Sequence, residues 1–125
     1  MASSALYMIG AGVIILWGIA HIVPTGKVVS GFGDITEDNR RIITMEWLAE
    51  GFALCFLGVL VLILTLFGYS AVEAGKVTIR CVAGMLLVMA VVTLLTGART
   101  KIIPIKICPF VKMAASVLML TGGFV

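Results

Sequence analysis

Long apolar stretches alternate along the chain with short segments that hold most of its charged residues. Residues 5–23, 51–72 and 81–98 contain no Asp, Glu, Lys or Arg, and residues 107–125 contain only Lys112. Each stretch is close to the length of about 20 residues that a helix needs to cross the hydrocarbon core of a bilayer. The pattern predicts an all-α integral membrane protein, a four-helix antiparallel bundle in which one domain covers residues 1–125, with helices at approximately 5–23, 36–67, 76–98 and 107–124.

The composition also favours a location in the membrane. Hydrophobic residues make up 62% of the chain and charged residues 12%, whereas soluble domains average about 45–50% apolar and about 25% charged residues. The opening residues, MASSALYMIG, contain no basic residue, and no small-residue cleavage site follows the first apolar stretch. We therefore expect this stretch to be retained as a helix rather than removed as a signal peptide, in a multi-pass protein of a prokaryotic-type plasma membrane.

The distribution of Lys and Arg predicts the orientation. Cytoplasmic loops of membrane proteins are enriched in these residues. The first and third connections carry Lys27, Arg40, Arg41, Arg99, Lys101 and Lys106, and the second carries only Lys76 and Arg80. The first and third connections are therefore predicted to be cytoplasmic, with both termini outside. No basic patch is interleaved with aromatic residues, so the lipid bilayer is the expected partner and nucleic acid is not.

Two connections have sequences that predict their structure. The first, PTGKVVSGFGDITEDNRR, is rich in Gly and is expected to lack regular structure until Asp34 and Glu37, spaced as in a capping box, start a helix near Ile35. The third, ARTKIIPIKICPF, alternates basic and apolar residues around Pro104 and Pro109. We expect it to lie along the membrane interface, with its isoleucines in lipid and its lysines in water.

Polar residues are predicted to gather at one level of the bundle. His21, the only histidine, falls in the last turn of the first helix, and Glu46 and Glu50 enter the second helix from the same side with a spacing of four. That spacing places both carboxylates on one helical face. Arg99 closes the third helix, and Lys112 falls in the first turn of the fourth. We expect these residues to form a proton-handling or ligand-binding cluster, with Glu50 as its central group, because an ionised carboxylate at that depth needs a partner or keeps its proton.

A purely structural role is the alternative for each of these residues. His21 would then hydrogen-bond a carbonyl of the last helical turn, and Glu46 would lie in headgroup water. A metal site is not predicted, because three ligands from two helices would need an unusual approach, and a single histidine excludes bis-histidine haem within one chain. No resident cofactor is expected, although contact with a quinone or a lipid stays open.

The cysteines predict no disulfide. Cys55, Cys81 and Cys108 form no CxxC motif and are expected at different membrane levels. Cys108 alone is predicted to be accessible at the start of the fourth helix, where it is either a reactive thiol or a packing residue.

Small residues are expected to allow close contact between helices, as they do in many membrane proteins. The candidate positions are Gly10, Gly18, Gly51, Gly58, Gly84, Ala114 and Ala115. Four methionines are expected to pack or to contact lipid rather than to relay a metal: Met85, Met89, Met113 and Met119.

The sequence resembles a known family in its layout. A first helix ending in WGIAHIVP, a glycine-rich loop and a second helix opening with EWLAEGFALCFLGVLVL are similar to the arrangement of the DoxX-like four-helix membrane proteins. The resemblance covers the topology of nearly the whole chain. It places His21 where that family often has lysine, and Glu46 or Glu50 where it has its acid. It implies a role as a membrane subunit beside redox enzymes such as thiosulfate:quinone oxidoreductase.

Three classes of function follow, in order of preference. The first is an accessory or assembly subunit of a larger membrane complex, with respiratory or redox complexes favoured and with other membrane subunits as partners. The second is a small homo-oligomeric transporter or channel in which Glu50 carries a proton or cation. The third is a quinone- or thiol-linked oxidoreductase component that uses Cys108 or His21. Autonomous catalysis is not expected, because no GxGxxG, P-loop, HExxH or GxSxG motif is present and little chain lies outside the helices.

Overall fold

The protein is described over residues 1–125 by a computed structural model in which 85% of the residues are helical and no strand occurs. The helical class predicted from the sequence is therefore confirmed. The elements in chain order are α1 (Ala2–Ile22), α2 (Thr25–Ser30), α3 (Glu37–Leu66), η1 (Tyr69–Ala71), α4 (Glu73–Leu95), η2 (Gly97–Arg99) and α5 (Ile103–Gly122).

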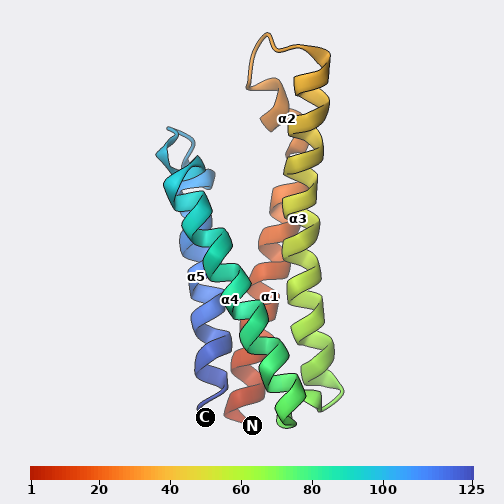
Figure 1. Cartoon of the computed structure of the whole chain (residues 1–125), viewed down its shortest axis with the longest axis vertical. Helices are drawn as coiled ribbons and strands as arrows, with labels where there is room; N and C mark the ends of the chain where they lie inside the picture. The colour runs from red at the N-terminus through yellow and green to blue at the C-terminus, as the bar shows by residue number, and fades with distance from the viewer.

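Four helices, α1, α3, α4 and α5, are long and apolar enough to cross a membrane. They run along the long axis of the molecule, and both termini lie at the same end (Figure 1). These properties fit a multi-pass helical membrane protein. Large apolar side chains such as Leu16, Phe56 and Val88 are exposed on the outside of the helices, as expected where lipid takes the place of water.

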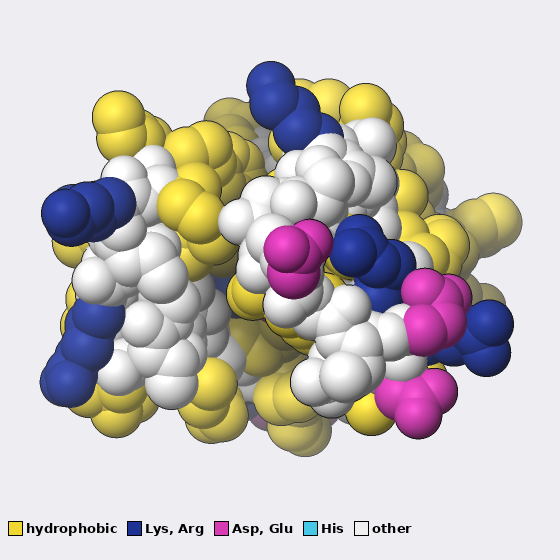
Figure 2. Space-filling model, turned by 90° about the horizontal axis from the view of Figure 1, so that it is seen from above, with side chains coloured by type: hydrophobic (Ala, Val, Ile, Leu, Met, Phe, Trp, Pro, Cys, Tyr) yellow, Lys and Arg dark blue, Asp and Glu magenta, His cyan; other side chains and the backbone are white.

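The long helices pack as two pairs joined through α1. Helix α1 packs extensively against α3 and against α5, and α4 packs against α5, whereas α3 and α4 contact each other little. The α1/α3 pair and the α4/α5 pair diverge toward the end of the molecule opposite the termini (Figure 1). Seen from that end, the molecule has two lobes with a hollow between them, and basic side chains lie on both lobes (Figure 2).

Glycines allow α1 and α3 to approach closely. A Cβ atom added to Gly18 would lie 2.6 Å from Cys55 Sγ and 2.9 Å from the carbonyl oxygen of Gly51. A Cβ atom on Gly58 would lie 2.9 Å from the carbonyl oxygen of Ala11. These positions, with Gly10, Gly51 and the buried Ala115, pack closely as the sequence predicted. The prediction is wrong for Gly84, where an added Cβ would meet nothing within 4 Å, and for Ala114, which is exposed.

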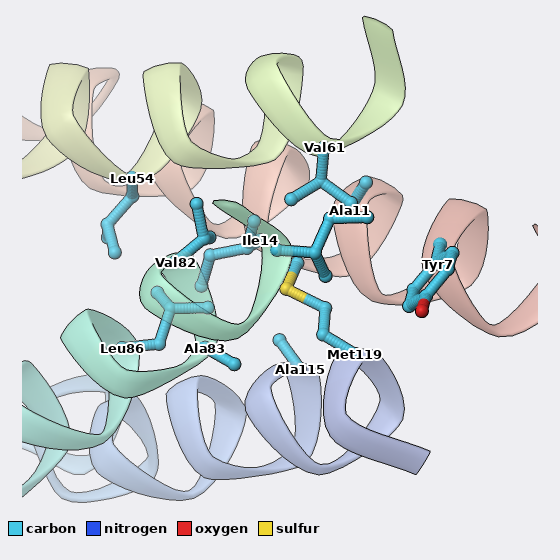
Figure 3. Close-up of a cluster of buried hydrophobic side chains, with 11 residues drawn as sticks. Tyr7, Ala11, Ile14, Leu54, Val61, Val82, Ala83, Leu86, Ala115 and Met119 are labelled. Carbon is cyan, nitrogen blue, oxygen red and sulfur yellow. The ribbon is translucent and has the colours of Figure 1, made fainter. Parts of the chain in front are cut away.

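The apolar core joins all four long helices. One cluster contains Tyr7 and Ile14 of α1, Leu54 and Val61 of α3, and side chains of α4 and α5 (Figure 3). Met119 is part of this core, in agreement with its predicted packing role. This core holds the helices together, and the polar residues described below lie nearer the end at which the two pairs diverge.

The first connection is more ordered than its glycines suggested. Thr25–Ser30 forms the short helix α2, and the Thr25 hydroxyl donates to the Ile22 carbonyl at 2.6 Å. Helix α3 starts at Glu37, and its N-cap is Thr36, whose side chain accepts a hydrogen bond from the Asn39 backbone N–H at 3.2 Å. The expected cap at Asp34 is therefore wrong, because the threonine immediately before the helix supplies the acceptor.

The third connection is shorter than predicted. Helix α5 begins at Ile103, so most of ARTKIIPIKICPF is helical and does not form a separate interfacial segment. Pro104 occupies the first turn, where its missing N–H costs no hydrogen bond, and Pro109 lies inside the helix. Helix α4 likewise begins at Glu73, a few residues before the predicted start.

Candidate functional site

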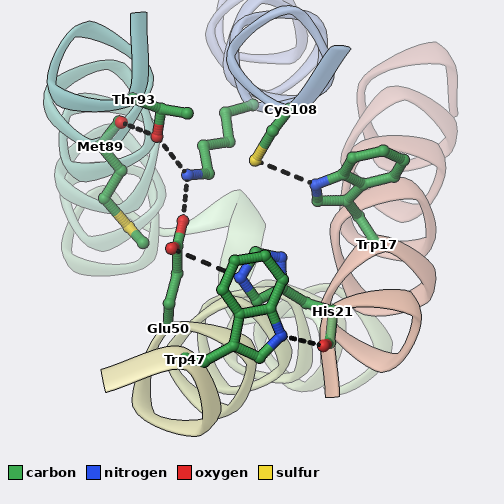
Figure 4. A network of polar contacts seen from close by, with 8 residues as sticks. Trp17, His21, Trp47, Glu50, Met89, Thr93 and Cys108 are labelled. Atoms are coloured by element: carbon green, nitrogen blue, oxygen red, sulfur yellow. Dashed lines mark hydrogen bonds and ion pairs between the residues drawn. The ribbon is translucent and has the colours of Figure 1, made fainter. Parts of the chain in front are cut away.

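An ion pair between α3 and α5 forms the centre of the polar site. The Lys112 ammonium donates to Glu50 Oε1 and, at 2.8 Å, to the hydroxyl of Thr93 on α4 (Figure 4). Thr93 in turn donates to the Met89 carbonyl at 2.8 Å. The Lys112 side chain is 0% exposed. One ammonium group therefore ties together three of the four long helices.

His21 brings the fourth long helix to this site. From the last turn of α1, its Nε2 atom lies 3.4 Å from Glu50 Oε2, and the residue is 8% exposed. This separation is an ion-pair distance, but Nε2 has no hydrogen-bond partner of good geometry. Each oxygen of the Glu50 carboxylate thus faces a different nitrogen, one from Lys112 and one from His21 (Figure 4).

Trp47 fixes the position of the imidazole. The two rings stack with centroids 4.0 Å apart and an interplanar angle of 13°. The Trp47 indole N–H also donates to the His21 carbonyl at 2.6 Å, which satisfies one of the free carbonyls at the end of α1. Trp47 precedes Glu50 by almost one turn of α3, so one helix supplies both the support and the partner of His21.

The Glu50–Lys112 pair differs from the other ion pairs of the chain. Arg41–Glu37 and Arg80–Glu73 each join residues of one helix, and their side chains are largely exposed. Exposed pairs of this kind contribute about 0–1 kcal/mol. A charge buried among apolar helices must be paired, because its desolvation is otherwise uncompensated. The pair of Glu50 and Lys112 is therefore the electrostatic contact on which the helix arrangement depends most.

Not every predicted site residue belongs to this network. Glu46 and Arg99 are exposed, and neither forms an ion pair. Glu46 lies one turn nearer the end at which the two helix pairs diverge, so α5 does not reach it. Lys112 was expected in the first turn of its helix, but the early start of α5 places it about 2.5 turns inside, level with Glu50.

Cys108 also differs from its prediction. It is 2% exposed, and its Sγ accepts a hydrogen bond from the Trp17 indole N–H at 3.2 Å. The expected accessibility of this thiol is therefore wrong, because α5 begins before it and carries it into the bundle. Trp17 accordingly makes a polar contact between α1 and α5.

A groove lies on the side of α3 next to the ion pair. We call it the α3 groove; its volume is about 460 Å³, and its lining residues are Ile42, Ile43, Glu46, Trp47, Ala49, Glu50 and Ala53. The Glu50 side chain is 32% exposed, whereas its partner Lys112 is fully covered. The network is thus reached from outside through the carboxylate and not through the ammonium. No group of three or more His, Cys, Asp or Glu side chains is arranged to hold a metal ion.

The comparisons with known proteins do not assign the chain to a family. No model of a known protein family, no curated protein and no solved structure matches it. The resemblance to the DoxX-like proteins stays a prediction from the sequence.

Proposed function

We propose that the protein is an accessory or assembly subunit of a larger membrane complex. In this proposal the chain is a four-helix antiparallel bundle in a prokaryotic-type plasma membrane, with both termini outside, and its own role is to bind and position other membrane subunits. The redox or respiratory nature of the complex rests on the resemblance to the DoxX-like proteins.

The exposed face of α3 is the observation that supports this proposal. Phe52 is 60% exposed and Phe56 is 64% exposed, and the small residues Ala49 and Ala53, also exposed, lie next to them. Small residues allow a second helix to approach closely, and neighbouring aromatic rings provide contact area. Helix α3 packs on α1 but contacts α4 little, so the chain covers this helix incompletely. A transmembrane helix of another subunit would cover it.

The proposed orientation has a direct test. Single cysteines at Ser3 and at Ser30 are introduced into a chain whose native cysteines, Cys55, Cys81 and Cys108, are replaced by alanine. A membrane-impermeant maleimide added to intact cells should label position 3 and should reach position 30 only after the membrane is opened. Labelling of both positions from the same side would show that α1 does not cross the membrane and would contradict the proposed orientation.

The assembly role predicts retained partners. When the tagged protein is purified from its native membranes in a mild detergent, it should elute with other membrane proteins at a fixed ratio, well above its own 13.2 kDa. Elution as a monodisperse monomer would contradict the proposal. The same preparation from a Phe52→Ser/Phe56→Ser variant should lose the partners, and a Val88→Ser/Val91→Ser variant on the exposed side of α4 should keep them.

A homo-oligomeric proton or cation transporter is the second candidate. The observation that favours it is the exposure of Glu50 to the α3 groove, because an intramembrane carboxylate reached from one side can exchange a cation or a proton. Its pairing with Lys112 favours the structural role instead. The third class, a thiol-linked oxidoreductase component, gains no support from Cys108, whose thiol is buried.

A further inference from the structure

The α3 groove contains two acidic side chains whose capacity for ion pairs and hydrogen bonds is only partly used within the bundle. Glu46 forms no ion pair, and of the two Glu50 oxygens only Oε1 accepts the Lys112 ammonium. Glu46 and Glu50 are one turn apart on one face of α3, where side chains four residues apart are neighbours. The two carboxylates outnumber the single ammonium of Lys112, so acidic groups are in excess at the groove.

A second feature indicates that the hydrogen-bonding capacity of Glu50, which lines the groove, is incompletely used. His21 Nε2 is buried without a hydrogen-bond partner, and it faces Glu50 Oε2 at 3.4 Å. Buried polar atoms in folded proteins are almost always hydrogen-bonded. Glu50 Oε2 therefore accepts no well-formed hydrogen bond from the bundle and keeps its capacity to accept one.

The remaining walls of the groove are apolar and aromatic. Ile42, Ile43, Ala49 and Ala53 line it, and Trp47 contributes an indole that stacks on the ring of His21. Aromatic rings attract cations through their faces, most strongly when the cation is partly desolvated. A volume of about 460 Å³ is within the range of about 300–1,000 Å³ that is typical of small-molecule sites.

We propose that the α3 groove is a binding site for an ammonium group carried on an apolar body. The ammonium donates to Glu46 and to Glu50 Oε2 beside Trp47, and the apolar part lies along the isoleucines and alanines. Ionised carboxylates give strong, charge-assisted hydrogen bonds to such a donor. Two sources share this chemistry, a lipophilic primary amine and the ethanolamine headgroup of a membrane lipid. This inference concerns the same side of α3 as the proposed assembly role, because Ala49 and Ala53 belong to both surfaces. Binding to the purified chain tests it separately.

Binding of matched amphiphiles tests the site. The purified protein in nanodiscs of phosphatidylglycerol is titrated with decylammonium and with decanol, which share the same tail, and heat is measured against empty nanodiscs. Decylammonium should bind at least tenfold more tightly than decanol. Glu46→Gln should weaken decylammonium by about tenfold, the size expected when one charge-assisted hydrogen bond is lost. Asp38→Asn, which removes another exposed carboxylate of α3 that forms no ion pair, should leave binding unchanged.

A second experiment identifies the source of the ammonium group. Native mass spectrometry of the protein from mixed vesicles should show phosphatidylethanolamine retained in excess over phosphatidylglycerol if the lipid is the ligand, with the excess lost in Glu46→Gln. Tight decylammonium binding without such an excess would assign the site to free amines. Equal binding of decylammonium and decanol, or a Glu46→Gln variant that binds like the wild type, would overturn the proposal. Because Glu46 is exposed and unpaired, this substitution does not threaten the fold.

Discussion

Replacing Glu50 with glutamine is expected to lower the free energy of unfolding by about 3 kcal/mol, the lower end of the range for breaking a buried ion pair. The loss is large because the Lys112 side chain is 0% exposed. The glutamine amide can still accept a hydrogen bond, as the Thr93 hydroxyl does, but neither group supplies the negative charge that the buried ammonium loses. Reversible unfolding in mixed micelles, followed by circular dichroism, measures the effect.

The companion variants separate this cause from a general disturbance of α3. In the double variant Glu50→Gln/Lys112→Met most of the stability should return, because no buried charge is left and methionine fills the space of the lysine stem. Glu37→Gln removes the carboxylate of an exposed pair and should cost less than about 1 kcal/mol. A double variant as unstable as Glu50→Gln alone would show that the pairing of the two charges is not what stabilises the helices.

Adding a single methyl group to α1 should affect the stability of the protein differently at two glycines. Gly18→Ala places a Cβ atom 2.6 Å from Cys55 Sγ and 2.9 Å from the Gly51 carbonyl oxygen, so α1 and α3 must separate at a cost of about 1–3 kcal/mol. Gly12→Ala meets nothing within 4 Å and should be neutral or stabilising by up to about 1 kcal/mol, because alanine is the better helix former.

The same unfolding experiment in micelles compares the two glycine variants. Because both substitutions change glycine to alanine within one helix, the changes in helix propensity and in composition are the same. Only the contact with α3 differs. Equal stability of the two variants would contradict the close packing of α1 on α3.

The apolar pattern was sufficient to predict the four long helices, since runs of about 20 uncharged residues have few alternatives to a membrane-spanning helix. It also led to Glu50, His21 and Lys112, because charged residues inside apolar helices must find partners. The predicted helix ends were less accurate. The predicted start of α5 is too late because the alternation of basic and apolar residues around Pro104 and Pro109 was interpreted as an interfacial segment. A proline in the first turn of a helix is favourable, and Pro104 lies in the first turn of α5.

The remaining partners of the site could not be predicted from sequence pattern. Thr93 and Trp47 depend on how the helices are rotated about their axes, and a period of 3.6 residues does not fix that rotation for helices that are apolar on all sides. Glu46 shares a face with Glu50, but whether it reaches α5 depends on how far the two helix pairs diverge. The spacing of His21 and Trp17, four residues apart on α1, is the one sequence feature that could have indicated the Trp17–Cys108 contact beside the cluster.

The claim that α3 binds another subunit is tested most directly by site-specific photocrosslinking in native membranes. Benzoylphenylalanine is placed at Phe56 of α3, and at Val88 of α4 as a control of similar exposure, 64% and 58% respectively. The account predicts a discrete adduct with a different membrane protein from position 56 and none from position 88. The absence of any protein adduct at position 56, or an adduct only with a second copy of the chain, would contradict the assembly role.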